Sequence, residues 1–190
     1  MTASPALDFL LTRRSRPVRS LTAPAPTKDV VMTLLTAAAR VPDHGKLEPW
    51  RFIVLERAAL GRLAQVIDDR AGALGYDAAL AAKGRDAYDL SPMAVVVVAS
   101  PKASDKIPVI EQTLSAGAVC AALVNAALAD GWGACWLTGW PAYDRGVMEQ
   151  GLDLAPDEWV AGIVHIGTQT AVPPDRPRPN MDSIVTWVSA

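Results

Sequence analysis

Two short basic segments carry the side chains of this sequence that are best suited to binding an anionic group. Arg13, Arg14 and Ser15 are consecutive and follow a short apolar stretch. Arginine donates paired, charged hydrogen bonds and serine adds a hydroxyl donor, so this run suits a phosphate, with a solvated basic turn as the alternative. A second pair, Arg176 and Arg178, lies in a proline-rich segment near the other end of the chain. That pair could complete a phosphate site or belong to a solvated tail.

A polar loop over residues 40–50 is the most informative single segment. It reads Arg-Val-Pro-Asp-His-Gly-Lys-Leu-Glu-Pro-Trp and precedes an apolar run typical of a strand. Its charges and prolines make it a poor candidate for the core, and it can present Arg40 and His44 to a ligand. His44 could act as a general acid, contact a cofactor, or cap backbone groups of the loop. His165 alternates with Ile163 in an apolar segment, so we expect a hydrogen-bonded histidine of the core or of a dimer contact.

The chain as a whole is mildly acidic, which bears on what the basic segments bind. Of its 190 residues, 51% are hydrophobic and 20% are charged, and the formal net charge is -2. These values indicate one globular domain over residues 1–190 and argue against a nucleic-acid partner, so the basic segments point to an anionic cofactor. Cys120 and Cys135 lack zinc-type spacing, and the two histidines are too few for a His-rich metal site. We expect both cysteines to be small core residues.

Motifs of several enzyme classes are absent from the sequence. The G-x-G-x-x-G fingerprint of dinucleotide-binding folds is incomplete at residues 131–133, and neither a P-loop nor a G-x-S-x-G elbow occurs. The first residues lack the order of a signal peptide, because the charges follow the apolar run. The long apolar segment at 109–129 contains Glu111 and Asn125. We therefore expect a buried helix there, no membrane span, and a cytoplasmic protein.

Hydrophobic periodicity predicts a mixture of helices and strands. The unbroken apolar run at 93–99, flanked by prolines, is typical of a strand buried on both faces. We predict helices at 5–12, 28–39, 58–69, 78–88, 109–130 and 143–150. We predict strands at 52–55, 93–99, 134–137 and 159–166, and a possible last strand at 183–188. The fold class is therefore α+β or mixed α/β.

The order of these segments resembles that of the FMN-dependent nitroreductase family, most closely its short bacterial YdjA-like branch. The resemblance rests on the Arg-Arg-Ser run, on the loop that ends in Pro-Trp at residues 49–50, and on Trp-Leu-Thr-Gly at residues 136–139. Ser-Ala-Gly at residues 115–117 and His-Ile-Gly-Thr at residues 165–168 extend it over almost the whole chain. The Arg-Val-Pro-Asp-His…Pro-Trp block is the most specific of these matches.

The resemblance implies a fold with a central, mainly antiparallel sheet flanked by helices, assembled as an intertwined homodimer that binds FMN between its subunits. The basic run would hold the phosphate and ribityl chain, and Arg176 or Arg178 would complete the phosphate site. Arg40 and His44 would reach the flavin of the partner subunit. The residues that the resemblance assigns to the cofactor are Arg13, Arg14, Ser15, Arg40, His44, Trp136, Leu137, Thr138, Arg176 and Arg178.

The resemblance also implies a reaction. Hydride would pass from NAD(P)H through the flavin to a small-molecule electron acceptor such as a nitroaromatic or a quinone, and no side chain is required as an acid or base. NADH and NADPH remain equal alternatives as donors. A flavin-storing or flavin-sensing protein with little turnover is the rival from another functional class, and a flavin-consuming or dehalogenating enzyme is a rival within the superfamily.

Overall fold

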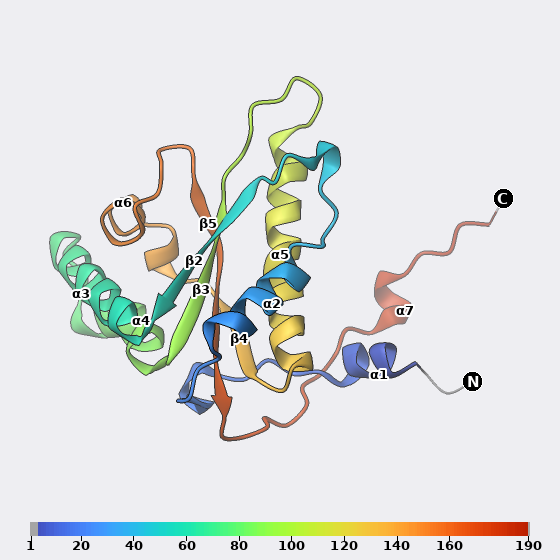
Figure 1. The fold of residues 1–190 in the computed structure, drawn as a ribbon, viewed down its shortest axis with the longest axis horizontal. Helices are drawn as coiled ribbons and strands as arrows, with labels where there is room; N and C mark the ends of the chain where they lie inside the picture. The colour runs from blue at the N-terminus through green and yellow to red at the C-terminus, as the bar shows by residue number, and fades with distance from the viewer. Residues whose placement is uncertain (1–3, 190) are drawn as a thin grey trace.

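The computed structural model describes residues 4–189, in which helices surround a five-stranded sheet (Figure 1). The strand order is β1-β5-β3-β2, with β4 also paired to β5, and every pairing is antiparallel. This architecture confirms the expected fold class. The strands are β1 (Leu21–Thr22), β2 (Trp50–Glu56), β3 (Met93–Ala99), β4 (Gly133–Leu137) and β5 (Trp159–Gln169).

Strand β3 is the centre of the sheet, as its apolar sequence predicts. All seven of its residues are buried, and it pairs with β2 on one side and with β5 on the other. Because side chains alternate across a strand, Val95 and Val97 pack into the core on one face while Val96 and Val98 pack into the core on the other. A strand that serves two cores needs an apolar residue at every position.

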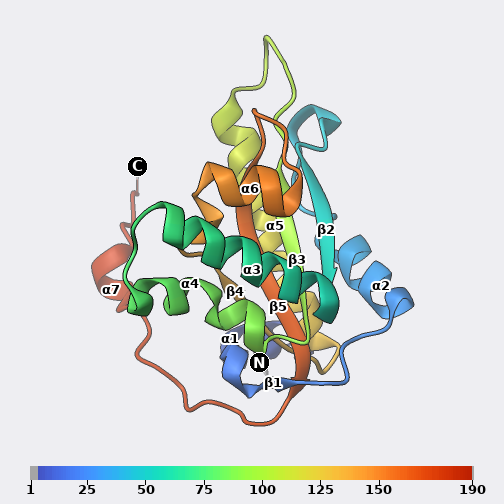
Figure 2. The same cartoon turned by 90° about the vertical axis from the view of Figure 1, so that its left-hand side faces the viewer.

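The two faces of the sheet are covered by different helices (Figures 1 and 2). Helices α2 (Lys28–Ala38) and α5 (Val109–Ala129) share one core with the sheet. Helices α3 (Arg57–Ala73) and α6 (Arg145–Leu152) share the other core, and Tyr88 of α4 (Ala78–Leu90) joins it. The predicted helices are confirmed, although α3 extends beyond its predicted bounds at both ends.

Helix α5 covers one face of the sheet together with α2 (Figure 1). It begins after Pro108 and is followed by Gly131, whose φ of 89° suits a glycine at a helix end. Among the described residues it is the one helix long and apolar enough to cross a membrane. Its inner side, including Val119 and Leu123, is buried in the core that it shares with the sheet. The expectation of a buried helix is therefore confirmed for that side.

The two ends of the described chain extend away from the core. Helix α1 (Pro5–Thr12) has no buried residue. The predicted strand at 183–188 is wrong, because the short helix α7 (Met181–Ile184) and an irregular segment occupy this region. Trp187 and Val188 are 90% and 91% exposed. No strand of the described chain lies beside Trp187 and Val188, so their backbone has no partner with which to form a ladder of hydrogen bonds.

Candidate cofactor site

The basic run lies at the end of helix α1, beside strand β4. Arg13 is the C-terminal cap residue of α1, and its Nη2 donates to the Ser15 hydroxyl at 2.9 Å. The next backbone amide, of Arg16, donates to the carbonyl of Ala134 in β4 at 2.8 Å. The Arg16 side chain also donates to the carbonyl oxygen of Arg14 at 2.6 Å. These bonds fix the run against the sheet, so it is not a free solvated turn.

The positive charges of this region repel one another. Burial is the main cause that lowers the pKa of Arg13, followed by the charges of Arg178, Arg14 and Arg16. The Nε of Arg13 is buried and has no hydrogen-bond partner among the described residues. An unpaired buried donor among like charges is costly, and an anion would relieve both penalties. The basic run is thus better suited to a bound phosphate than to a solvated surface.

The proline-rich segment folds back onto the basic run. The Arg14 side chain donates to the carbonyl of Pro174 at 3.3 Å and lies 3.7 Å from the Asp175 carboxylate. Arg178 pairs with the same carboxylate at 2.9 Å. Arg178 therefore lies close enough to affect the pKa of Arg13, and the assignment of Arg176 or Arg178 to a phosphate site stays a prediction.

A cleft of about 580 Å³ brings three distant parts of the sequence together. Its walls include Arg14 and Ser15 of the basic run, Trp136 and Leu137 of β4, and Arg176 of the tail. All five were predicted cofactor residues. Sequence reasoning missed the contribution of α4, whose Lys83, Asp86 and Ala87 form another wall. Their helix shows a weak pattern in the sequence, with no motif that marks a site.

The aromatic wall of this cleft depends on a glycine. A Cβ atom at Gly162 would collide with the indole ring of Trp136 across the β4–β5 pair. Gly162 thus lets the indole lie over the neighbouring strand, leaving Trp136 40% exposed at the end of β4. The adjacent Cys135 is buried, and burial raises the pKa of its thiol to about 12. Burial does the same to Cys120, so both cysteines are core residues, as expected.

The loop over residues 40–50 is held in one conformation by its own polar groups. The Asp43 carboxylate accepts from the amides of Leu47 and Glu48, at 3.2 and 2.8 Å. Gly45 has a φ of 72°, and Lys46 and Glu48 have φ values of 54° and 48°. Non-glycine residues adopt such values at a cost, which the surrounding structure must offset. The loop is therefore a preorganised support for the exposed side chains that it carries.

Arg40 and His44 do not lie in the cleft of their own chain. His44 Nδ1 lies 2.7 Å from the Glu111 carboxylate, at the first turn of α5. The basic run and β4 lie toward the opposite end of α5 (Figure 1). A helix of 21 residues is about 30 Å long. One chain therefore presents two parts of the expected site at separate places, and the assignment of Arg40 and His44 to the partner's flavin stays a prediction.

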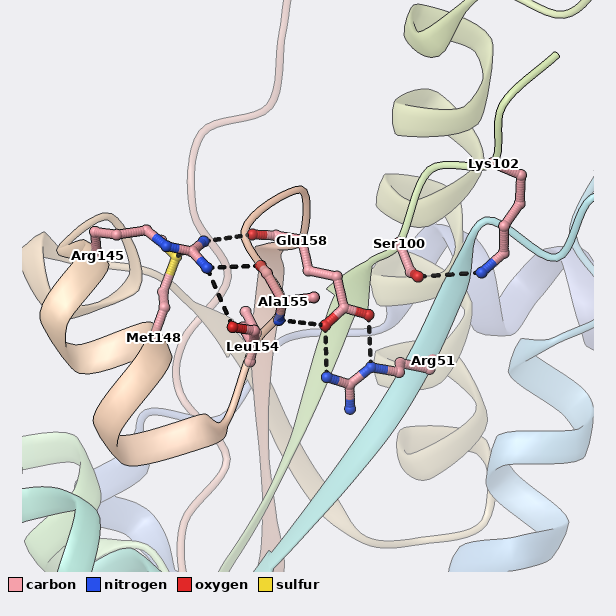
Figure 3. Close-up of polar contacts among 8 residues, drawn as sticks. All are labelled: Arg51, Ser100, Lys102, Arg145, Met148, Leu154, Ala155 and Glu158. Atoms are coloured by element: carbon pink, nitrogen blue, oxygen red, sulfur yellow. Dashed lines mark hydrogen bonds and ion pairs between the residues drawn. The ribbon is translucent and has the colours of Figure 1, made fainter.

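A polar network at the start of β5 was also missed from the sequence (Figure 3). The Glu158 carboxylate accepts from Arg51 Nε and Nη2 at 2.7 and 2.6 Å, and from the amide of Ala155 at 3.1 Å. Arg145 donates to the carbonyl oxygens of Leu154, Ala155 and Glu158. The Arg51 hydrogen bonds are the main cause that lowers the pKa of Glu158 to about 2. The network fastens the loop between α6 and β5.

A second cavity adjoins the cleft. It has a volume of about 360 Å³, and Lys83, Ala87 and Leu137 line both spaces. Thr138, the predicted site residue that directly follows β4, lines this second cavity together with His165. His165 is only 1% exposed, so its expected place in the core is confirmed. The expectation that it is hydrogen-bonded is wrong, because its Nδ1 has no partner among the described residues.

Comparison with known proteins gives consistent matches. The sequence profile of the Nitroreductase family matches residues 10–168. The "Putative NAD(P)H nitroreductase YdjA" of Escherichia coli (strain K12) is 33% identical over 163 residues, which cover 86% of this chain and 87% of that protein. A "Putative NAD(P)H nitroreductase" of Haemophilus influenzae is 34% identical over 167 residues, covering 86% of this chain and 88% of that protein.

Solved structures share the fold at lower sequence identity. A nitroreductase-like family protein from Bacillus cereus superposes with a TM-score of 0.83 at 22% identity, covering 100% of this chain and 99% of the other. An FMN-dependent nitroreductase from Clostridium difficile gives a TM-score of 0.64 at 21% identity, with 94% of each chain covered. These likenesses confirm the expected nitroreductase-like arrangement of helices and antiparallel sheet.

Proposed function

The chain belongs to the nitroreductase family, and from that premise we propose that this oxidoreductase uses FMN to transfer hydride from NAD(P)H to a nitroaromatic, a quinone or a similar acceptor. The observation that carries the cofactor proposal is the arginine cluster around the buried, unpaired Nε of Arg13. A phosphate monoester supplies the acceptor oxygens and the negative charge that this cluster lacks.

The cleft has room for FMN, and its side chains suit the chemistry of that cofactor. Arg14 and Ser15, which line the cleft, would bind the phosphate and the adjoining hydroxyl groups. Arg13 and Arg178 lie beside this basic wall and add further positive charge. Trp136 and Leu137 offer a largely apolar wall to a flat ring. FMN is favoured over FAD because the sequence has no complete dinucleotide fingerprint for a second phosphate and an adenosine.

The reaction would depend on how the chain positions the cofactor and the substrates. Bound FMN supplies the hydride-transfer chemistry, while the chain binds, orients and shields it. Lys83 contributes a positive charge from α4 to the wall of the cleft. Such a positive charge would stabilise negative charge on a bound cofactor ring. No side chain of the cleft needs to donate or abstract a proton in this scheme, so we assign no catalytic acid or base.

We propose that the active form is a homodimer, on the ground of unpartnered apolar surface. Leu10 and Leu11 of α1 are 55% and 68% exposed, and Ile110 and Leu114 of α5 are 62% and 66% exposed. A helix of eight residues such as α1 is not stable alone in water, so it needs a surface to cover it. A second copy of the chain carries matching apolar patches and can cover these surfaces reciprocally.

The separation of the two halves of the site supports the same assembly. If two copies of α5 pack antiparallel about a twofold axis, the first turn of each helix lies beside the last turn of the other. The loop that carries Arg40 and His44 in one subunit would then approach the cleft of its partner. The exposed tail around Trp187 would pack on the partner, which makes the dimer intertwined, and β2 offers it a free sheet edge.

The test starts from the purified protein. We expect it to carry a flavin that is released on denaturation and elutes as FMN in chromatography, and that loses its colour when NADH or NADPH is added without oxygen. Release of FAD, or failure of the apoprotein to bind added FMN, would refute the cofactor assignment. A bound FMN that neither nicotinamide reduces would favour the storage or sensor alternative.

A further inference from the structure

Glu111 is a charged residue whose place in the fold the cofactor cleft does not explain. It lies in the first turn of α5, and Pro108 is the N-cap residue of that helix. A glutamate three residues after the N-cap commonly reaches back to the N-cap amide, but proline has no amide hydrogen. The Glu111 carboxylate instead meets the loop over residues 40–50, where it lies 2.7 Å from Nδ1 of His44. Capping of the helix therefore does not account for this side chain.

The contact fixes which ring nitrogen of His44 carries hydrogen. A carboxylate has no hydrogen to donate, so Nδ1 must be the donor. Which nitrogen of a neutral imidazole is protonated is set by such bonds, and the acceptor nitrogen is then Nε2. In a solvated histidine the hydrogen lies mainly on Nε2 instead. The side chain is 62% exposed, and Nε2 makes no hydrogen bond among the described residues. This nitrogen is therefore free to accept from an N–H or O–H group of a ligand.

Other contacts hold the backbone on both sides of His44. Ser115, one turn further along α5, donates to the carbonyl of Pro42 at 2.8 Å. The Asp43 carboxylate accepts from two amides on the far side of the histidine. The loop lies beside the first turns of α5 (Figure 1). An exposed ion pair such as that of Glu111 and His44 contributes little to stability. The role left to Glu111 therefore concerns the imidazole ring and not the loop backbone.

From these contacts we propose that Glu111 is a positioning residue, which orients His44 so that Nε2 accepts a hydrogen bond from a cofactor N–H group in the partner's cleft. The imide of the isoalloxazine ring and the carboxamide of the nicotinamide carry such groups. Nitro and quinone oxygens have no hydrogen to donate, so the neutral Nε2 would not bind them. The role in ligand binding rests on the proposed function, because it requires His44 to reach the flavin of the partner subunit. The place of the hydrogen on the ring does not.

The two histidines of the chain permit a direct measurement in the apoprotein. In protein labelled with ¹⁵N-histidine, a spectrum at about pH 9, where an ordinary histidine is neutral, distinguishes protonated from unprotonated ring nitrogens. We expect His44 to carry its hydrogen on Nδ1, and Glu111→Ala to move it mainly to Nε2. The buried His165 is the internal control and should not change. Glu149→Ala, which removes a paired and exposed carboxylate of α6, is the matched control variant and should leave both rings as they are. A parent His44 protonated mainly at Nε2, or an unchanged ring in Glu111→Ala, would overturn the proposal.

Addition of ligands to the labelled protein tests the contact with the cofactor. A shift of the His44 Nε2 signal on addition of FMN would identify the isoalloxazine imide as its partner. A shift only on further addition of a tetrahydro analogue of NADPH, which cannot transfer hydride, would identify the nicotinamide. Bound FMN with no shift at either step would exclude the contact. If FMN fails to bind, the proposed function fails, and the apoprotein spectra still decide whether Glu111 orients His44.

Turnover gives an independent measure of the same role. Glu111→Ala and His44→Ala should each lower kcat/KM per bound flavin about fivefold, as for one lost hydrogen bond. The double variant should be no slower than His44→Ala, because Glu111 acts through the imidazole ring. Glu149→Ala should leave the rate unchanged. Losses that add in the double variant would show that Glu111 acts independently of His44 and would refute the positioning role.

Discussion

Replacing Arg13 by methionine should weaken cofactor binding without weakening the apoprotein. Methionine keeps the apolar stem and removes the guanidinium group. Loss of one charge-assisted hydrogen bond to a phosphate costs about 1.5–3 kcal/mol. This corresponds to a dissociation constant for FMN that is roughly tenfold to more than a hundredfold higher. A titration of apoprotein with FMN, followed by flavin fluorescence, measures this change.

The apoprotein should respond in the opposite sense, because in the absence of an anion Arg13 is a destabilising group. Its Nε is buried without a partner among the described residues, and burial followed by the charges of neighbouring arginines lowers its pKa. The substitution loses the bond to Ser15, worth about 1 kcal/mol, and removes an unpaired buried donor that costs about 1–3 kcal/mol. We therefore expect the free energy of unfolding of the apoprotein to stay constant or to rise.

The control is Arg62→Met, which removes an exposed charge on α3. It should leave both FMN affinity and the free energy of unfolding within about 0.5 kcal/mol of the parent. The reasoning would be refuted if Arg13→Met bound FMN as tightly as the parent protein. It would also be refuted if the apoprotein lost more than about 1.5 kcal/mol in denaturant unfolding, because the arginine would then be a structural group.

Three further predictions concern other parts of the molecule. The pKa of Glu158 is lowered from 4.5 to about 2, mainly by its hydrogen bonds with Arg51. This ion pair should therefore contribute up to about 3 kcal/mol to the free energy of unfolding at neutral pH. The contribution is complete above about pH 4.5 and is lost as the pH falls toward 2. Denaturant unfolding of the parent and of Glu158→Gln should therefore differ at pH 6 and converge near pH 2, and an equal difference at both would contradict the linkage. Leu114→Arg should dissociate the dimer and weaken FMN binding together, as measured by light scattering and titration; a monomer with full affinity would show that each cleft is complete in one chain. If donor and acceptor use one cleft in turn, initial rates should give parallel double-reciprocal lines, and His44→Ala should lower the rate per bound flavin; intersecting lines would exclude alternate binding.

Local sequence was sufficient to predict most helices and strands of this protein. The valine run in β3 predicts a strand buried on both faces, because no polar face is left for solvent. The helical spacing of apolar residues in α2 and α3 likewise reports which side of each helix is buried. The Arg-Arg-Ser run predicted a group of side chains suited to binding an anion, because the chemistry of arginine and serine does not depend on the rest of the fold. Local pattern failed in the tail, where a strand-like sequence has no neighbouring strand to pair with.

The tertiary structure decided which of these side chains act together. Arg14 and Pro174 are separated by 160 positions and form a hydrogen bond, which no periodicity in either segment predicts. The loop with Arg40 and His44 looked like part of the same site, yet the length of α5 separates it from the cleft in one chain. His165 looked like an ordinary core residue, and only the packing of α4 against β5 shows that its Nδ1 lacks a partner. A sequence pattern reports whether a side chain is buried, whereas hydrogen-bond partners and cavities depend on how distant elements pack.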